Sequence, residues 1–184
     1  VAEIIDILRR KMARDYPPGS TLRDAHPKAL GVLHGSFTVE DDLPADLCVG
    51  VFQPGRRYDC WLRSSSASGK PQSDAVSDLR GLAIQLQGAT GAGSADVPMA
   101  QDFVLLSHHS MPLGTVRLFR DAIYYSIESS PLLLLAKFLV TGHFGALVAL
   151  KKAGSCPTSP LDIRYWSTTP YRFGPDRAVK YGLL

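Results

Sequence analysis

The stretch TLRDAHPKALGVLHGSF, residues 21–37, places Arg23 three residues before His26 and Pro27 directly after it, at the start of an apolar run. A residue that precedes proline is disfavoured in the helical region, so we expect an extended or polyproline-II backbone at His26. Pro27 has no backbone N–H to donate to a β-ladder, and a strand can therefore begin only here or just beyond. The sequence thus predicts an imidazole held at the start of a strand.

The composition suits a single globular domain. The chain has 184 residues, of which 45% are hydrophobic and 20% charged, enough to form a sizeable core. The net charge of +3 is spread along the chain without a basic run, so nucleic-acid binding is not indicated. Cys48, Cys60 and Cys156 lie far apart without metal-ligand spacing, which is typical of buried free thiols in a reducing compartment. With no signal peptide in view, we expect a cytoplasmic protein.

Hydrophobic periodicity divides the chain into strands followed by helices. An amphipathic helix is predicted over residues 1–14, with an apolar stripe of Ile4, Ile5, Leu8 and Met12. Strands are predicted over residues 29–39, 58–66, 81–87 and 102–109, with a flexible connection over 88–96. Helices are predicted over 116–127 and 131–152, and further strands within 161–174 and 177–183. This order predicts an α+β fold built on an antiparallel β-barrel with flanking helices.

The segment PLLLLAKFLVTGHFGALVALKK, residues 131–152, is apolar enough to be tested as a membrane span. Lys137 and His143 interrupt it, and its longest stretch without Lys, Arg, Asp or Glu has about 13 residues, against the ~18–20 that a span requires. We therefore expect a buried helix, no transmembrane span, and at most a weak association with a membrane surface.

Several motifs occur in a fixed order along the chain. They are R23-x-x-H26-x-K28, WLRSSS (61–66), DLRGLAIQL (78–86), QDFVLLSH (101–108) and PLDIRYWSTTPYRFGPDRAVKY (160–181). Together they resemble the haem-binding core of the catalase family, and its catalase-related peroxidase branch more than the main enzymes. The resemblance implies one catalase-like domain over residues 1–184, truncated at its C-terminus, with residues 1–20 as an N-terminal helix and linker.

The resemblance also implies roles for individual residues around haem b, which is iron protoporphyrin IX. His26 matches the distal acid–base, and Ser65 matches the hydroxyl that orients its imidazole. Arg23 and Arg63 match residues that pair with the haem propionates, a task suited to the guanidinium fork. Small or aromatic side chains beside the distal pocket are matched by Ala25, Ala67 and Phe119, and Gly81 would allow close approach of the backbone.

Two departures from the family pattern affect what the chain can do. The family Asn that helps to orient peroxide is replaced within LLSHHSM, where Leu106, Ser107 or His108 takes its place, and we take Ser107 as the catalytic substitute. Family enzymes hold the iron through a Tyr with an Arg four residues ahead. The resemblance implies that this Tyr lies on a helix near the end of the domain, and that this chain ends before that helix, so the sequence assigns no metal ligand.

The resemblance implies a haem-dependent peroxidase or catalase-like oxidoreductase that acts on hydrogen peroxide or organic hydroperoxides. Two alternatives stay open. One is a haem-free or truncated barrel that binds an apolar ligand without catalysis. The other is a haem enzyme that converts fatty-acid hydroperoxides. The expected partner is a small-molecule peroxide, and the sequence is also compatible with a homo-oligomer.

Overall fold

The computed structural model describes residues 1–89 and 101–184, so most of the connection predicted over residues 88–96 lies outside the described residues. Helix α1 (Ala2–Asp15) begins the chain. The long strands are β1 (Ala29–Thr38), β2 (Arg57–Ser66), β3 (Arg80–Leu86) and β4 (Gln101–Leu106), with the short 3-10 helix η1 (Ala45–Leu47) between the first two. Helices α2 (Val116–Ile127), α3 (Pro131–Val140) and α4 (Phe144–Ala153) follow. The last elements are β5 (Tyr165–Trp166), β6 (Tyr171–Arg172), β7 (Ala178–Val179) and β8 (Gly182–Leu183).

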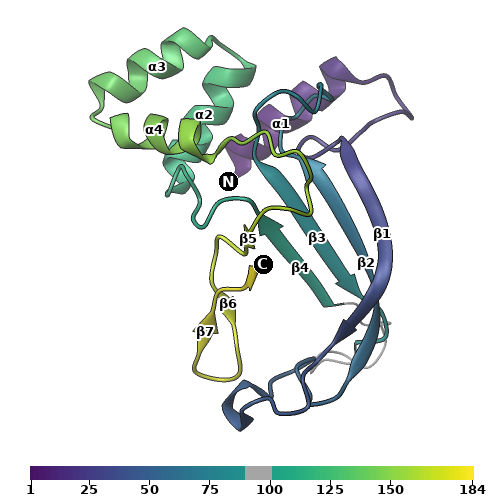
Figure 1. Ribbon diagram of the computed structural model, residues 1–184. Helices are drawn as coiled ribbons and strands as arrows, with labels where there is room; N and C mark the ends of the chain where they lie inside the picture. Colours follow the sequence, from purple (N-terminus) through teal and green to yellow (C-terminus); the bar gives the residue numbers. More distant parts are fainter. Residues whose placement is uncertain (90–100) are drawn as a thin grey trace.

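The strands form one curled antiparallel sheet. Its six strands lie in the order β1-β2-β3-β4-β5-β8, and β6 pairs with β7 separately. The sheet curls into a half-barrel, with the helices gathered beyond one end and η1 beyond the other (Figure 1). An α+β fold with a partial barrel and flanking helices is therefore the architecture of the described residues.

One face of this sheet carries the core. The alternating strand β3 turns Leu82, Ile84 and Leu86 to this face, where they are buried with Phe103 and Leu105 of β4. Residues directly opposite each other in antiparallel strands share a face, and Leu82 lies opposite Leu105 while Ile84 lies opposite Phe103. Register is fixed because a slip by one residue would move this apolar set to the other face.

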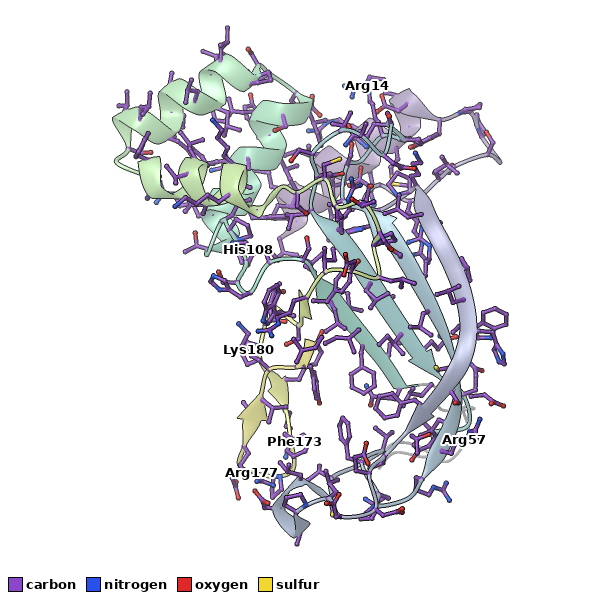
Figure 2. The ribbon with its side chains drawn as sticks, in the orientation of Figure 1. Arg14, Arg57, His108, Phe173, Arg177 and Lys180 are labelled. Carbon is purple, nitrogen blue, oxygen red and sulfur yellow. The ribbon has the colours of Figure 1, made fainter. Side chains whose placement is uncertain are left out.

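The C-terminal strands are tied back to the rest of the molecule by basic side chains. Lys180 Nζ donates to the His109 carbonyl (2.6 Å), and Arg177 Nη1 lies 3.3 Å from an Asp46 carboxylate oxygen. The Arg177 guanidinium also lies 5.4 Å from the centre of the Phe173 ring, and Figure 2 shows these two side chains close together in the segment after β6. These contacts connect the last strands to both ends of the half-barrel.

The single helix predicted over residues 131–152 is wrong in two respects. The chain breaks at Gly142, which adopts φ +73°, so that two ten-residue helices replace one long one. The outer face of α3 is also exposed rather than buried, with Leu132 at 75% and Val140 at 87% exposure.

In residues 1–89 and 101–184 we find no helix with both the length and the apolar character needed to cross a bilayer.

Two smaller predictions are corrected. In α1 the most buried residues are Ile7 and Lys11, while Ile5 of the predicted stripe is exposed. The thiol of Cys156 is exposed and only that of Cys60 is fully buried, although all three cysteines are free.

Candidate functional site

His26 and Ser65 meet where β1 approaches β2. The Ser65 hydroxyl lies 2.9 Å from His26 Nδ1. Ser65 lies opposite Ala29 of β1 and opposite Gly81 of β3, so its position is fixed by ladders on both sides. A hydrogen bond to one ring nitrogen orients an imidazole and leaves the other nitrogen for proton transfer. The pair predicted from the sequence is therefore brought together.

The backbone at His26 differs from the expected extended conformation, because its φ is +55°. Positive φ is uncommon for a residue other than glycine, although His is enriched there, and it costs on the order of 1–3 kcal/mol. Two contacts hold the residue in place: the bond to Ser65, and a 2.8 Å hydrogen bond from Arg63 Nη2 to the His26 carbonyl. Strand β1 begins at Ala29, beyond Pro27, as predicted.

Gly81 forms the surface against which the imidazole rests. A Cβ added at this position would lie 2.6 Å from His26 Cε1, 2.7 Å from Nδ1 and 3.0 Å from the Ser65 hydroxyl. Such distances are below van der Waals contact, so any side chain at position 81 would displace the ring. The lack of a side chain is what allows the imidazole to lie over β3.

We expect Gly81→Ala to destabilise the protein by about 1–3 kcal/mol, because the added methyl overpacks the His26 ring. Gly31→Ala is the matched control, since a Cβ at Gly31 would meet no atom within 4 Å. Urea denaturation of both variants measures the difference in free energy of unfolding. Equal stability of the two variants would show that the ring does not rest on Gly81.

Charges of both signs lie near the imidazole. Burial is the main cause that lowers the pKa of His26, the nearby Asp78 carboxylate opposes this, and Arg63 and Arg23 lower the pKa further. Burial, followed by the charge of Arg23, also lowers the pKa of the Arg63 guanidinium. Among the described residues, neither Arg23 nor Arg63 forms an ion pair. The site thus combines an imidazole of lowered pKa with two nearby arginines that form no ion pair in the described chain.

The lowered pKa predicts a loss of stability on acidification. The unfolded chain takes up this proton near pH 6.5, the ordinary pKa of His, whereas the folded chain resists it to lower pH. Stability is therefore complete above pH 6.5 and declines as the pH falls from 6.5 through the folded pKa of His26. Unfolding free energies measured across this range should decline less in His26→Gln than in the wild type. A parallel decline in both proteins would contradict the assignment.

A cavity of about 570 Å³ opens between α1, α2 and the loop that follows β2, and Ala25, the residue before His26, forms part of its wall. Ala25, Ala67 and Phe119 all line it, so the structure gathers three residues that the resemblance placed beside the distal pocket. Apolar side chains of the two helices complete much of the wall: Leu8, Ala122, Ile123 and Ile127. A volume of this size is in the range of ligand sites.

Ser107, predicted to take the place of the family Asn, directly follows the last residue of β4. Its hydroxyl accepts a hydrogen bond from the Arg80 backbone N–H (2.9 Å). The register places Leu106 directly opposite Gly81, on the same face as Ser65 and the imidazole, and Ser107 is the next residue along. The structure does not bring Ser107 into a contact with His26, and its catalytic role stays a prediction.

Sequence reasoning did not single out Arg80 and Asp78, which hold the loop over residues 67–79. The Asp78 carboxylate accepts from the backbone N–H groups of Ser68 (2.8 Å) and Leu79 (2.8 Å). Arg80 is only 2% exposed, and its Nη2 donates to the Asp74 (2.8 Å) and Val76 (3.2 Å) carbonyls. Both residues belong to the DLRG motif (78–81), so the charged residues of that motif were the sequence feature that could have pointed to this loop-holding role.

No cluster of three or more His, Cys, Asp or Glu side chains suited to a metal ion occurs in residues 1–89 and 101–184. A haem iron does not require one, because the porphyrin supplies four of its ligands and a single side chain holds it axially.

Comparisons with known proteins support the fold alone. No protein-family model matches the chain, and no curated protein matches it in sequence. Among solved structures, catalase A from Saccharomyces cerevisiae superposes with a TM-score of 0.59 at 21% identity. The match covers 91% of this chain but 34% of that catalase, so this chain spans about a third of the length of that structure. The chain therefore has a partial catalase-like fold.

Proposed function

We propose that this chain forms the distal side of a haem-dependent peroxidase site that cleaves hydrogen peroxide or organic hydroperoxides. The observation that carries the proposal is the hydrogen-bonded pair of His26 and Ser65, which rests on Gly81. The residue before His26, Ala25, forms part of the wall of the cavity together with Ala67 and Phe119. The catalase-like fold agrees with it.

The residues present fit a haem on three counts. Gly81 leaves room for the imidazole to lie flat against β3. Ala25 and Ala67 keep the neighbouring cavity wide, and Phe119 adds an apolar wall. Arg23 lies close enough to lower the pKa of Arg63, and neither arginine has an acidic partner among the described residues, which suits the two propionates of haem. The proposal covers this face of the haem and assigns no iron ligand.

In this scheme His26 acts as a general acid–base. Burial keeps the imidazole neutral, so Nε2 can take the proton from one peroxide oxygen and return it to the other as the O–O bond breaks. Ser65 is a positioning residue, because its hydroxyl holds Nδ1 and thereby aims Nε2. Bound haem would supply the iron-centred redox chemistry of the cleavage. A wide cavity with apolar walls also favours organic hydroperoxides, including those of fatty acids, as substrates.

Replacement of Ser65 by Ala tests this positioning role. We expect peroxide turnover by the haem-loaded chain to fall about ten-fold, because a net hydrogen bond of about 1–1.5 kcal/mol that orients the base is lost. The pH at which the rate is half-maximal should also shift, since the imidazole loses its partner. Ser64→Ala is the control, because Ser64 is adjacent but points to the opposite face of β2. Equal rates and pH profiles for the two variants would contradict the proposal.

A haem-free barrel that binds an apolar ligand is the second candidate. It is favoured by the same cavity, where Leu8, Phe119, Ile123 and Ile127 form a largely apolar wall between α1 and α2. This candidate predicts that a fluorescent fatty acid binds, that hemin does not compete, and that His26→Ala leaves the affinity unchanged. Displacement of the fatty acid by hemin would instead favour the haem site.

A further inference from the structure

Helix α3 presents a continuous apolar face to solvent. Its exposed large apolar residues are Leu132, Leu133, Leu135, Leu139 and Val140. With 3.6 residues per turn they fall within an arc of about 160°. Ala136 lies within the same arc, and Phe138 on the opposite side is fully buried. The neighbouring end of α4 adds Phe144, which is also exposed. An exposed patch of this kind marks a site of interaction rather than ordinary surface.

The surroundings of this face are basic. Residues 129–161 contain Lys137, Lys151 and Lys152 and no Asp or Glu. Lys137 borders the apolar arc and, with Arg117 and His143, lines a cavity of about 310 Å³ between α2, α3 and α4. The acid in that cavity, Asp121, is buried and lies 3.1 Å from Arg120. In the described part of the chain, neither Arg117 nor Lys137 forms an ion pair.

We propose that the α3–α4 pair docks on the surface of an anionic lipid bilayer. The apolar arc of α3 enters the boundary between headgroups and acyl chains, and Arg117, Lys137 and the lysines of α4 face the lipid phosphates. A helix that lies in the plane of the bilayer surface needs an apolar face flanked by basic residues. It does not need the length of a membrane-spanning helix. The charge pattern selects this occupant, because a segment with three lysines and no carboxylates complements a surface of negative charge. Figure 1 shows α3 and α4 at the outer end of the molecule, away from the sheet.

Flotation of the chain Val1–Leu184 with vesicles tests the proposal. We expect binding to phosphatidylcholine vesicles that contain phosphatidylserine, weak binding to pure phosphatidylcholine, and release by high salt. Leu132→Glu with Leu139→Glu should weaken binding to the anionic vesicles at least ten-fold, since two charges enter the interface. Arg117→Gln with Lys137→Gln should weaken it about ten-fold or more, because each cation near such a surface contributes about five-fold.

Matched variants separate these effects from a general change of charge. Leu47→Glu with Leu161→Glu introduces the same two charges at exposed apolar sites outside α3 and α4. Arg9→Gln with Arg57→Gln removes two cations elsewhere. Both controls should bind nearly as the wild type, and circular dichroism checks that all variants fold.

Three results would overturn the proposal. One is no binding to anionic vesicles, and another is equal binding to neutral and anionic vesicles. The third is self-association through α3, seen as a dimer in light scattering that Leu132→Glu with Leu139→Glu converts to a monomer without any change in vesicle binding. None of these results bears on peroxide cleavage, so the two proposals fail independently.

Discussion

Replacing His26 by Ala is expected to lower the rate of peroxide cleavage by the haem-loaded chain about 10²–10⁴-fold, the usual contribution of a positioned general acid–base. Burial lowers the pKa of His26, which favours the neutral imidazole that can accept a proton, and Ser65 holds the ring through Nδ1. Stopped-flow measurement of peroxide consumption under single-turnover conditions gives the rate directly.

His34→Ala is the matched control for this experiment. His34 lies in β1, eight residues after His26, is exposed, and packs against Trp61 with ring centres 4.8 Å apart. Its removal should leave the rate close to the wild type. A similar loss in both variants would show that the effect is not specific to the His26 imidazole and would contradict its role as the acid–base.

The second large effect is expected at Arg80. This side chain is buried and donates to the Ser66 hydroxyl and to the Asp74 and Val76 carbonyls. Replacement by Met keeps much of its apolar volume but leaves these acceptors without a donor. Since hydrogen bonds from a charged group contribute about 1.5–3 kcal/mol each, we expect Arg80→Met to lower the free energy of unfolding by at least about 3 kcal/mol.

Urea denaturation of Arg80→Met beside Arg57→Met measures this loss. Arg57 is an exposed arginine at the start of β2, so its replacement should change stability by less than about 0.5 kcal/mol. The loop over residues 67–79 lines the cavity, and limited proteolysis should cut it faster in Arg80→Met. A stability loss no greater than that of Arg57→Met would mean that the buried guanidinium contributes little.

The strands could be predicted well because their apolar residues alternate. Leu82, Ile84 and Leu86 already define a buried face in the sequence, and burial confirms it. The same periodicity could not reveal the break at Gly142, because apolar residues continue on both sides of the turn. Hydrophobic periodicity also gave no reason to bury Lys11 of α1. In the structure Lys11 is buried, because its ion pair with Asp24 (2.7 Å) compensates the charge of the side chain.

The candidate site was predictable only in part. The sequence motifs identified His26, Ser65 and Gly81 as candidate site residues. The contact among these three residues depends on the register of β1, β2 and β3, which the motifs do not specify. The positive φ of His26 could not be predicted, because the rule for residues before proline excludes helical geometry without selecting the left-handed region. The cavity is formed where α1 and α2 meet the loop after β2, and such long-range packing leaves no local pattern in the sequence.

The most direct test of the central claim, that this chain forms a haem pocket against His26, is titration of the purified chain with hemin, followed in the visible spectrum. We expect a sharp Soret band that saturates at a single site in the wild type. Ala67→Trp should abolish it, because the indole would project into the cavity and occupy space that the haem needs. Weak binding that does not saturate, or saturation that Ala67→Trp leaves unchanged, would contradict the claim.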